Sequence, residues 1–78
     1  MSRNLYWEPI IPRGKSLPDS LKYIFRRHWG EPIDRILDLK DLDYLIGIRD
    51  ALNDQTSQEV QKLIEAIQHY SEIRVWEQ

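Results

Sequence analysis

Residues 72–77 carry the simplest hydrophobic pattern in the chain. They alternate polar and apolar side chains, and a period of two is typical of a strand with one buried face. In such a strand Ile73 and Val75 turn toward a core. Arg74 and Trp76 then lie on the other face. The alternation therefore predicts a C-terminal strand with an arginine and a tryptophan on its outer surface.

A second strand is predicted near the other end of the chain, over residues 5–11. This segment is rich in aromatic and β-branched residues, which favour strands. Its first four side chains alternate, with Leu5 and Trp7 inward and Tyr6 and Glu8 outward. Pro9 and Pro12 cannot donate to a central strand, so we expect an edge strand. A turn is predicted to follow over residues 12–15.

Residues 16–29 have the period of a helix. Apolar and aromatic positions recur three or four residues apart and so form one helical face. The residues of this face are Leu17, Leu21, Ile24, Phe25 and His28. Ser16 with Asp19 three residues later is typical of a helix N-terminus, and Gly30 is typical of a helix end. We expect the first helix between these signals.

Two further helices are predicted after residue 38. The second begins after Asp38 or Asp41, both suitable N-caps, and ends near Asn53. Gly47 lies inside it, where a glycine lowers stability, so we expect another helix to approach closely there. The third opens with the capping-box spacing Thr56-Ser57-Gln58-Glu59. Its core positions are Val60, Leu63, Ile64 and Ile67.

Residues 33–40 leave two interpretations open, a short strand or an extended connection, and we favour the connection. The order of elements is then β-α-α-α-β, in a single domain that spans residues 1–78. The predicted fold class is α+β, with three helices packed on a two-stranded sheet formed by the N- and C-terminal segments. The helices are needed because an isolated pair of strands is only marginally stable in water.

The residues that catalysis or metal binding would need are sparse or badly spaced. The chain has no cysteine, which excludes disulfides and thiolate metal sites. The run Gly14-Lys15-Ser16 matches the end of a phosphate-binding loop, but Pro9 stands where the first glycine of that motif belongs. The two histidines, His28 and His69, are assigned to different helices. We therefore expect no enzyme activity, no cofactor and no metal.

Targeting signals are also missing from the sequence. No apolar run is long enough to cross a membrane, and the first residues lack the apolar stretch of a signal peptide. A chain without cysteine suits a reducing compartment. These features predict a cytoplasmic protein with no membrane contact.

Charge is distributed unevenly along the chain. Residues 1–40 hold eight Lys or Arg against five acidic residues, a balance of +3. Residues 41–78 hold three against eight, a balance of −5, and the two halves sum to the net charge of −2. This asymmetry predicts a basic and an acidic face. Such faces can steer association with a charged partner.

These features favour protein–protein binding, as an adaptor, an inhibitor or a small subunit of bacterial or mobile-element type. Trp and Arg are enriched at interface hot spots. Open strand edges accept a partner strand or a second copy, so a homodimer is also compatible with the sequence. The candidate partner-binding residues are Tyr23, Arg26, Arg27 and Trp29 on the first helix, and Arg74 and Trp76 on the last strand.

Nucleic-acid binding is the alternative function. Lys22, Arg26 and Arg27 form a basic strip on the first helix that could follow phosphates. The acidic net charge weighs against this function, because dedicated nucleic-acid binders are usually basic. For the protein-binding function, we expect Arg26→Glu combined with Arg27→Glu to abolish binding and leave the fold intact.

Overall fold

The computed structural model describes residues 3–8 and 15–78, and it confirms the α+β class with three α-helices. The elements in chain order are β1 (Leu5–Glu8), β2 (Lys15–Leu17), α1 (Asp19–Trp29), β3 (Asp34–Asp38), the short 3-10 helix η1 (Leu39–Asp41), α2 (Leu42–Ala51), α3 (Gln55–Tyr70) and β4 (Glu72–Glu77). The predicted turn and the predicted continuation of the first strand fall on residues 9–14, outside the described residues.

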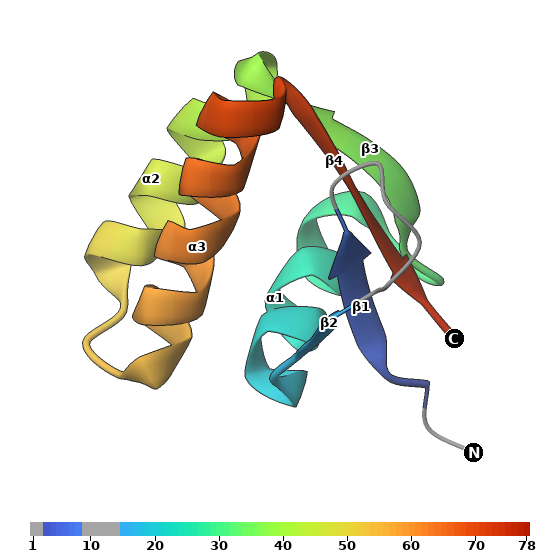
Figure 1. Ribbon diagram of the computed structural model, residues 1–78. Helices are drawn as coiled ribbons and strands as arrows, with labels where there is room; N and C mark the ends of the chain where they lie inside the picture. The colour runs from blue at the N-terminus through green and yellow to red at the C-terminus, as the bar shows by residue number, and fades with distance from the viewer. Residues whose placement is uncertain (1–2, 9–14) are drawn as a thin grey trace.

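The four strands form one antiparallel sheet in the order β2-β1-β4-β3 (Figure 1). The predicted pairing of the terminal strands is confirmed, with Trp7 opposite Val75, but the sheet has four strands and not the predicted two. The prediction of an edge strand was wrong, because β1 lies between β4 and β2. Residues 15–17 were expected to lead into the first helix. They pair with β1 instead and supply one edge of the sheet.

β3 occupies the segment for which we favoured an extended connection, so that interpretation was wrong. It runs antiparallel to β4, with Leu37 opposite Ile73. Leu37 is fully buried, and the N–H of Glu77 donates to the carbonyl oxygen of Ile33 at 2.9 Å. Pairing with β4 is a contact between distant parts of the chain, and no local sequence pattern reports it.

The first helix ends as predicted but begins later. Gly30 follows α1 with a φ of 83°, which glycine adopts without the steric cost of a side chain. Ser16 lies in β2 and does not cap the helix. α3 begins earlier than predicted, because the carboxylate of Asp54 accepts the N–H of Thr56 at 2.9 Å and forms the N-cap. Thr56 therefore lies in the first turn.

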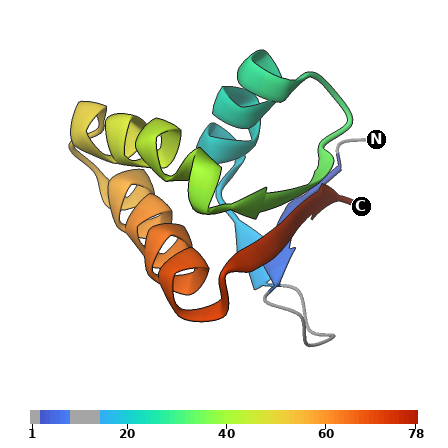
Figure 2. The same ribbon diagram turned by 90° about the horizontal axis from the view of Figure 1, so that it is seen from above.

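All three helices lie on one face of the sheet (Figures 1 and 2). The core between the two layers includes Leu5, Trp7, Leu37, Ile73 and Val75 from the strands and Leu21, Phe25, Leu45, Val60, Leu63, Ile64 and Ile67 from the helices. The predicted inward positions of both terminal strands and the core positions of α3 are confirmed. On α1 the predicted face differs at two positions: His28 is exposed, and Lys22 is buried.

α2 starts where the sequence predicted and packs beside α3 (Figure 1). Asp38 caps η1 by accepting the N–H of Lys40 at 2.9 Å, and Asp41 directly precedes α2. The expectation of a close approach at Gly47 was wrong, since a side-chain carbon there would meet no atom within 4 Å. The glycine therefore lowers helix stability without any packing need for it.

Candidate functional site

Two hollows border the C-terminal end of α1. One has a volume of about 260 Å³ and the other about 490 Å³, and both are wide open to solvent. Their lining residues are Arg3, Tyr23, Arg26, Arg27, Gly30, Glu31 and Pro32. The described part of this lining contains no serine, cysteine or histidine and thus no nucleophile with an adjacent base. Within residues 3–8 and 15–78, no group of three His, Asp or Glu side chains could hold a metal ion.

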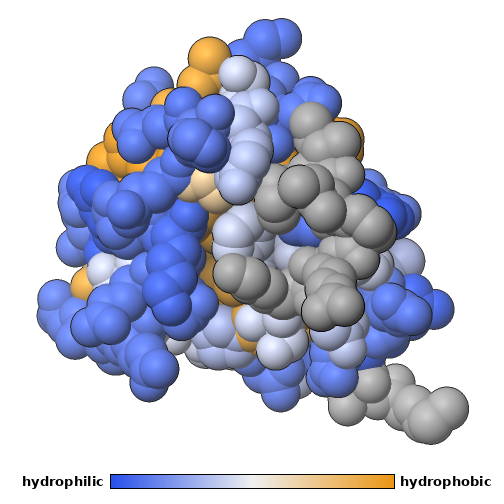
Figure 3. All heavy atoms as spheres, in the orientation of Figure 1, coloured by the Kyte–Doolittle hydropathy of each residue, from blue (hydrophilic) through white to orange (hydrophobic). Residues whose placement is uncertain are grey.

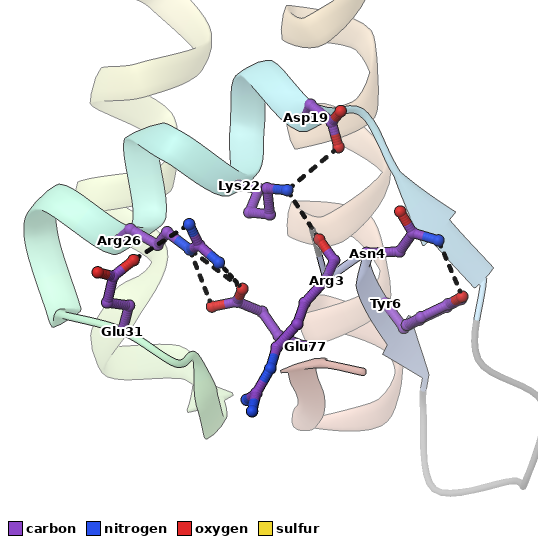
Figure 4. Close-up of polar contacts among 8 residues, drawn as sticks. All are labelled: Arg3, Asn4, Tyr6, Asp19, Lys22, Arg26, Glu31 and Glu77. Carbon is purple, nitrogen blue, oxygen red and sulfur yellow. Dashed lines mark hydrogen bonds and ion pairs between the residues drawn. The ribbon is translucent and has the colours of Figure 1, made fainter. Parts of the chain in front are cut away.

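Lys22, expected on the basic strip of α1, is engaged inside the protein. Its side chain is 1% exposed, and its ammonium donates to the carbonyl oxygen of Arg3 at 2.7 Å (Figure 4). The carboxylate of Asp19 lies 3.5 Å from the same ammonium. A buried ammonium needs such partners to offset the loss of hydration. Lys22 therefore joins α1 to the start of β1 and is not accessible to a phosphate.

Arg26 and Glu77 form a polar contact between α1 and the end of β4 (Figure 4). The guanidinium Nε donates to Oε1 at 3.0 Å and to Oε2 at 3.2 Å, and Nη2 also donates to Oε1. The Glu77 side chain is 0% exposed and also accepts the N–H of Ile33 at 2.6 Å. Hydrogen bonding from Arg26 lowers the pKa of Glu77 although burial opposes this shift, and the same bonding raises the pKa of Arg26. Both groups are therefore ionised at neutral pH.

This contact changes what a substitution at Arg26 can test. Glutamate at that position would set a second carboxylate against the buried Glu77, which is strongly unfavourable. The double charge reversal therefore does not separate binding from folding. Tyr23, which is 53% exposed, and Arg27 remain at the surface of α1. They are the part of the predicted α1 site that a partner can reach most freely.

Trp29 is half-buried in an aromatic cluster that joins α1 to α2 and β3. Its ring meets Phe25 edge-on at 5.0 Å and Tyr44 edge-on at 5.1 Å, and the guanidinium of Arg35 lies 4.6 Å from its centre. His28 stacks on Tyr44 at 3.7 Å. Burial raises the pKa of Tyr44, with Arg27 opposing the shift. Trp29 therefore packs elements together, and only part of its ring is open to a partner.

The face of the sheet that turns away from the helices carries the other two predicted residues. We call it the open face. By strand alternation its described positions are Tyr6, Glu8, Ser16, Asp34, Ile36, Asp38, Glu72, Arg74 and Trp76. The rings of Tyr6 and Trp76 stack with centroids 5.8 Å apart, and the guanidinium of Arg74 lies 4.7 Å from the Trp76 ring. Arg74 also donates to both oxygens of Asp34 at 3.2 Å, which raises the pKa of Arg74.

The open face is both apolar and acidic. Ile36 is 50% exposed and lies opposite Arg74 in the pairing of β3 with β4. Four carboxylates share the face with this one guanidinium, giving a formal charge of −3 from the positions named above. Aromatic faces attract cations, and the carboxylates add to that attraction while repelling phosphate. The open face therefore suits a cationic group better than an anionic one.

The six predicted residues do not form one site. The four on α1 belong to the helical layer, whereas Arg74 and Trp76 lie on the open face of the sheet by strand alternation. Sequence reasoning missed the neighbours of this pair on the open face. Alternation had placed Tyr6 outward, so that signal was present. Asp34 and Ile36 were missed because their segment was interpreted as a connection.

The hairpin of α2 and α3 offers no comparable surface on its visible side. In Figure 3 that side is mostly hydrophilic, and hydrophobic residues appear there only as scattered spots. No helix in the described part of the chain is long and apolar enough to cross a lipid bilayer. Comparisons with protein-family models, with curated proteins and with solved structures found no match to this chain.

Proposed function

We propose that this protein is a non-enzymatic module that binds another protein through its open face, as an adaptor, an inhibitor or a small subunit. The observation that supports this most is the row of Tyr6, Trp76, Arg74 and Ile36 on the face of the sheet that turns away from the described helices. Tyr, Trp and Arg supply much of the energy at protein interfaces. The stacked rings and the tethered guanidinium are already ordered, so binding costs them little further freedom.

Charge favours a protein over a nucleic acid as the partner. The open face is acidic, whereas nucleic-acid binding depends on neutralising phosphates with Lys and Arg. On α1 the ammonium of Lys22 and the guanidinium of Arg26 already have internal partners, which leaves Arg27 with few neighbours to form a basic strip. The proposal involves no cofactor. We also propose a cytoplasmic location, because a cysteine-free chain suits a reducing compartment.

Affinity capture from native-host lysate, with and without nuclease, tests the proposal on wild type and three single variants. Trp76→Thr removes the ring from the open face and keeps a residue that favours strands. Arg27→Glu reverses the exposed charge of α1. Tyr70→Thr is the control, because it removes an aromatic ring that is 43% exposed at the end of α3, whereas the Trp76 ring is half-buried on the open face. Each variant must first show wild-type circular dichroism and an unchanged melting temperature.

We expect one protein to be recovered in stoichiometric amount despite nuclease, to be lost with Trp76→Thr and to be kept with Tyr70→Thr. Loss with Arg27→Glu and retention with Trp76→Thr would move the site to α1. Material that disappears after nuclease treatment, and whose binding weakens log-linearly with salt, would replace the proposal with the nucleic-acid alternative.

A further inference from the structure

The outer edge of β3 presents backbone groups that take part in no strand pairing among residues 3–8 and 15–78. The N–H of Glu77 donates to the carbonyl of Ile33, so the backbone of residue 33 turns toward β4. In an antiparallel pair the residues alternate between facing the partner strand and facing away. The backbone N–H and C=O groups of the odd-numbered residues of β3 therefore point toward β4. Asp34 and Ile36 turn their N–H and C=O groups toward the outer edge.

This edge is the longer of the two in the sheet and is accessible. β3 has five residues, whereas β2 at the other edge has three. Asp34, Arg35 and Ile36 are all exposed, and no other strand within residues 3–8 and 15–78 pairs with this side of β3. The N–H of Asp38 is already bound to the carboxylate of Asp41 at 3.0 Å. The N–H and C=O groups of Asp34 and Ile36 can therefore receive an added strand.

The side chains along the edge define the chemistry of such a strand. Asp34, Ile36 and Asp38 occupy every second position and lie in a row on the open face. In a strand added at this edge, every second side chain lies on the open face, next to the row of Asp34, Ile36 and Asp38. Opposite charges and apolar pairs at neighbouring positions stabilise a sheet. A matching strand therefore carries a basic, an apolar and a second basic residue at alternate positions.

We infer that β3 accepts an extended segment of the partner protein by strand addition, and that this segment has the pattern basic–x–apolar–x–basic. The inference rests on the proposed function and names the partner's chemistry. Arg74 shares the carboxylate of Asp34, so Asp38 and Glu72 supply more of the unbalanced charge that attracts the segment. Main-chain hydrogen bonds provide affinity in this mode, and the alternate side chains provide specificity.

A second copy of the chain suits this edge poorly. If two β3 strands paired antiparallel about Ile36, Asp34 of each copy would stand opposite Asp38 of the other. Like charges directly opposite one another destabilise a sheet, and charged residues on edge strands are a known protection against self-association. The same acidic row thus opposes a homodimer at β3 and attracts a basic segment.

Titration of the ¹⁵N-labelled protein with synthetic peptides, followed by NMR, tests this inference without the natural partner. The probe is an end-blocked peptide Gly-Thr-Arg-Thr-Val-Thr-Lys-Thr-Gly, which sets Arg, Val and Lys on one side of a strand. The first control peptide, Gly-Arg-Thr-Thr-Val-Thr-Thr-Lys-Gly, has the same composition with both basic residues on the side opposite Val. The second control is the probe methylated on the valine nitrogen, which removes one donor to the edge.

We expect saturable shifts of the Asp34 and Ile36 amides and slower hydrogen exchange of both with the probe, and binding at least about tenfold weaker with either control peptide. Ile36→Lys should weaken the binding of the probe by about tenfold, since it removes an apolar contact with the valine and adds a positive charge beside the basic residues of the peptide. Leu39→Lys is the matched control, because Leu39 is 59% exposed but lies outside β3, and it should retain wild-type affinity.

Equal binding of the probe and the control peptides, or shifts that avoid β3, would overturn the inference. The captured partner then separates this failure from failure of the proposed function. If the partner is lost with Trp76→Thr but kept with Ile36→Lys, the open face binds a protein without strand addition at β3. If the partner is kept with both variants, the proposed function itself is wrong.

Discussion

The exchange Glu77→Gln tests how far one buried ion pair holds α1 to the sheet. The carboxylate of Glu77 is fully buried and accepts hydrogen bonds from Arg26 and from the N–H of Ile33. Glutamine keeps the size of the side chain, but it removes the negative charge and one of the two acceptor oxygens. The guanidinium of Arg26 then lies against a neutral amide, with Glu31 as its remaining carboxylate partner.

Burial sets the size of the expected effect. Removal of one partner from a buried ion pair lowers the free energy of unfolding by about 3–5 kcal/mol. For Glu77 we expect the lower end, about 3 kcal/mol, because the Arg26 side chain stays partly exposed to solvent and keeps its contact with Glu31. For 78 residues, the general scale gives a free energy of unfolding of about 4–12 kcal/mol. The variant should therefore melt about 12–24 °C below wild type.

Thermal unfolding followed by far-ultraviolet circular dichroism at neutral pH measures this difference. Asp34→Asn is the matched control, because Asp34 and Arg74 also form a two-bond contact between carboxylate and guanidinium. The Asp34 side chain is 62% exposed, so water replaces most of what the pair contributes. We expect the melting temperature of the Asp34→Asn variant to stay within a few degrees of that of wild type. Equal losses in the two variants would refute the argument that burial decides the contribution of these pairs.

Three further predictions concern pH and the glycines at positions 30 and 47. The pKa of Glu77 is lowered in the folded protein, so its contribution to stability is complete above its ordinary value of 4.5 and is lost as the pH falls through the folded value. The melting temperatures of wild type and Glu77→Gln should therefore converge in acid, and a constant gap would contradict this. Gly47→Ala should stabilise the protein by about 1 kcal/mol in urea unfolding, since the added methyl group meets open space. Gly30→Ala, at φ 83° and ψ 175°, should instead lose about 1–3 kcal/mol, and a gain there would contradict the assigned backbone conformation.

The open face was only partly predictable from the sequence. Alternation correctly placed Arg74, Trp76 and Tyr6 away from the core, because neighbouring side chains of a strand point to opposite faces wherever the strand lies. The stacking of Tyr6 on Trp76 depends on the register between β1 and β4. Ile36 joins the face through the pairing of β3 with β4. A sequence pattern does not specify register between segments that lie so far apart in the chain.

The sequence by itself determined the features that repeat within one element. The period of α3 identified its buried positions, from Val60 to Ile67, and the glycine after α1 marked where that helix ends. Alternation in the last six residues of the sheet separated Ile73 and Val75 from their outward neighbours. In each case one side of an element buries apolar area, and the spacing of that side is a local property.

Tertiary structure alone decided which polar groups are buried and which short segments become strands. Arg26 has the sequence context of a solvated helical face, yet it pairs with a carboxylate 51 residues away. Lys22 is buried because β1 places the carbonyl of Arg3 within reach of its ammonium. β2 and β3 are strands because each pairs with a distant strand, β2 with β1 and β3 with β4. Buried charged side chains and short strands depend on partners from distant parts of the chain. The local sequence around such a residue or segment does not identify that partner.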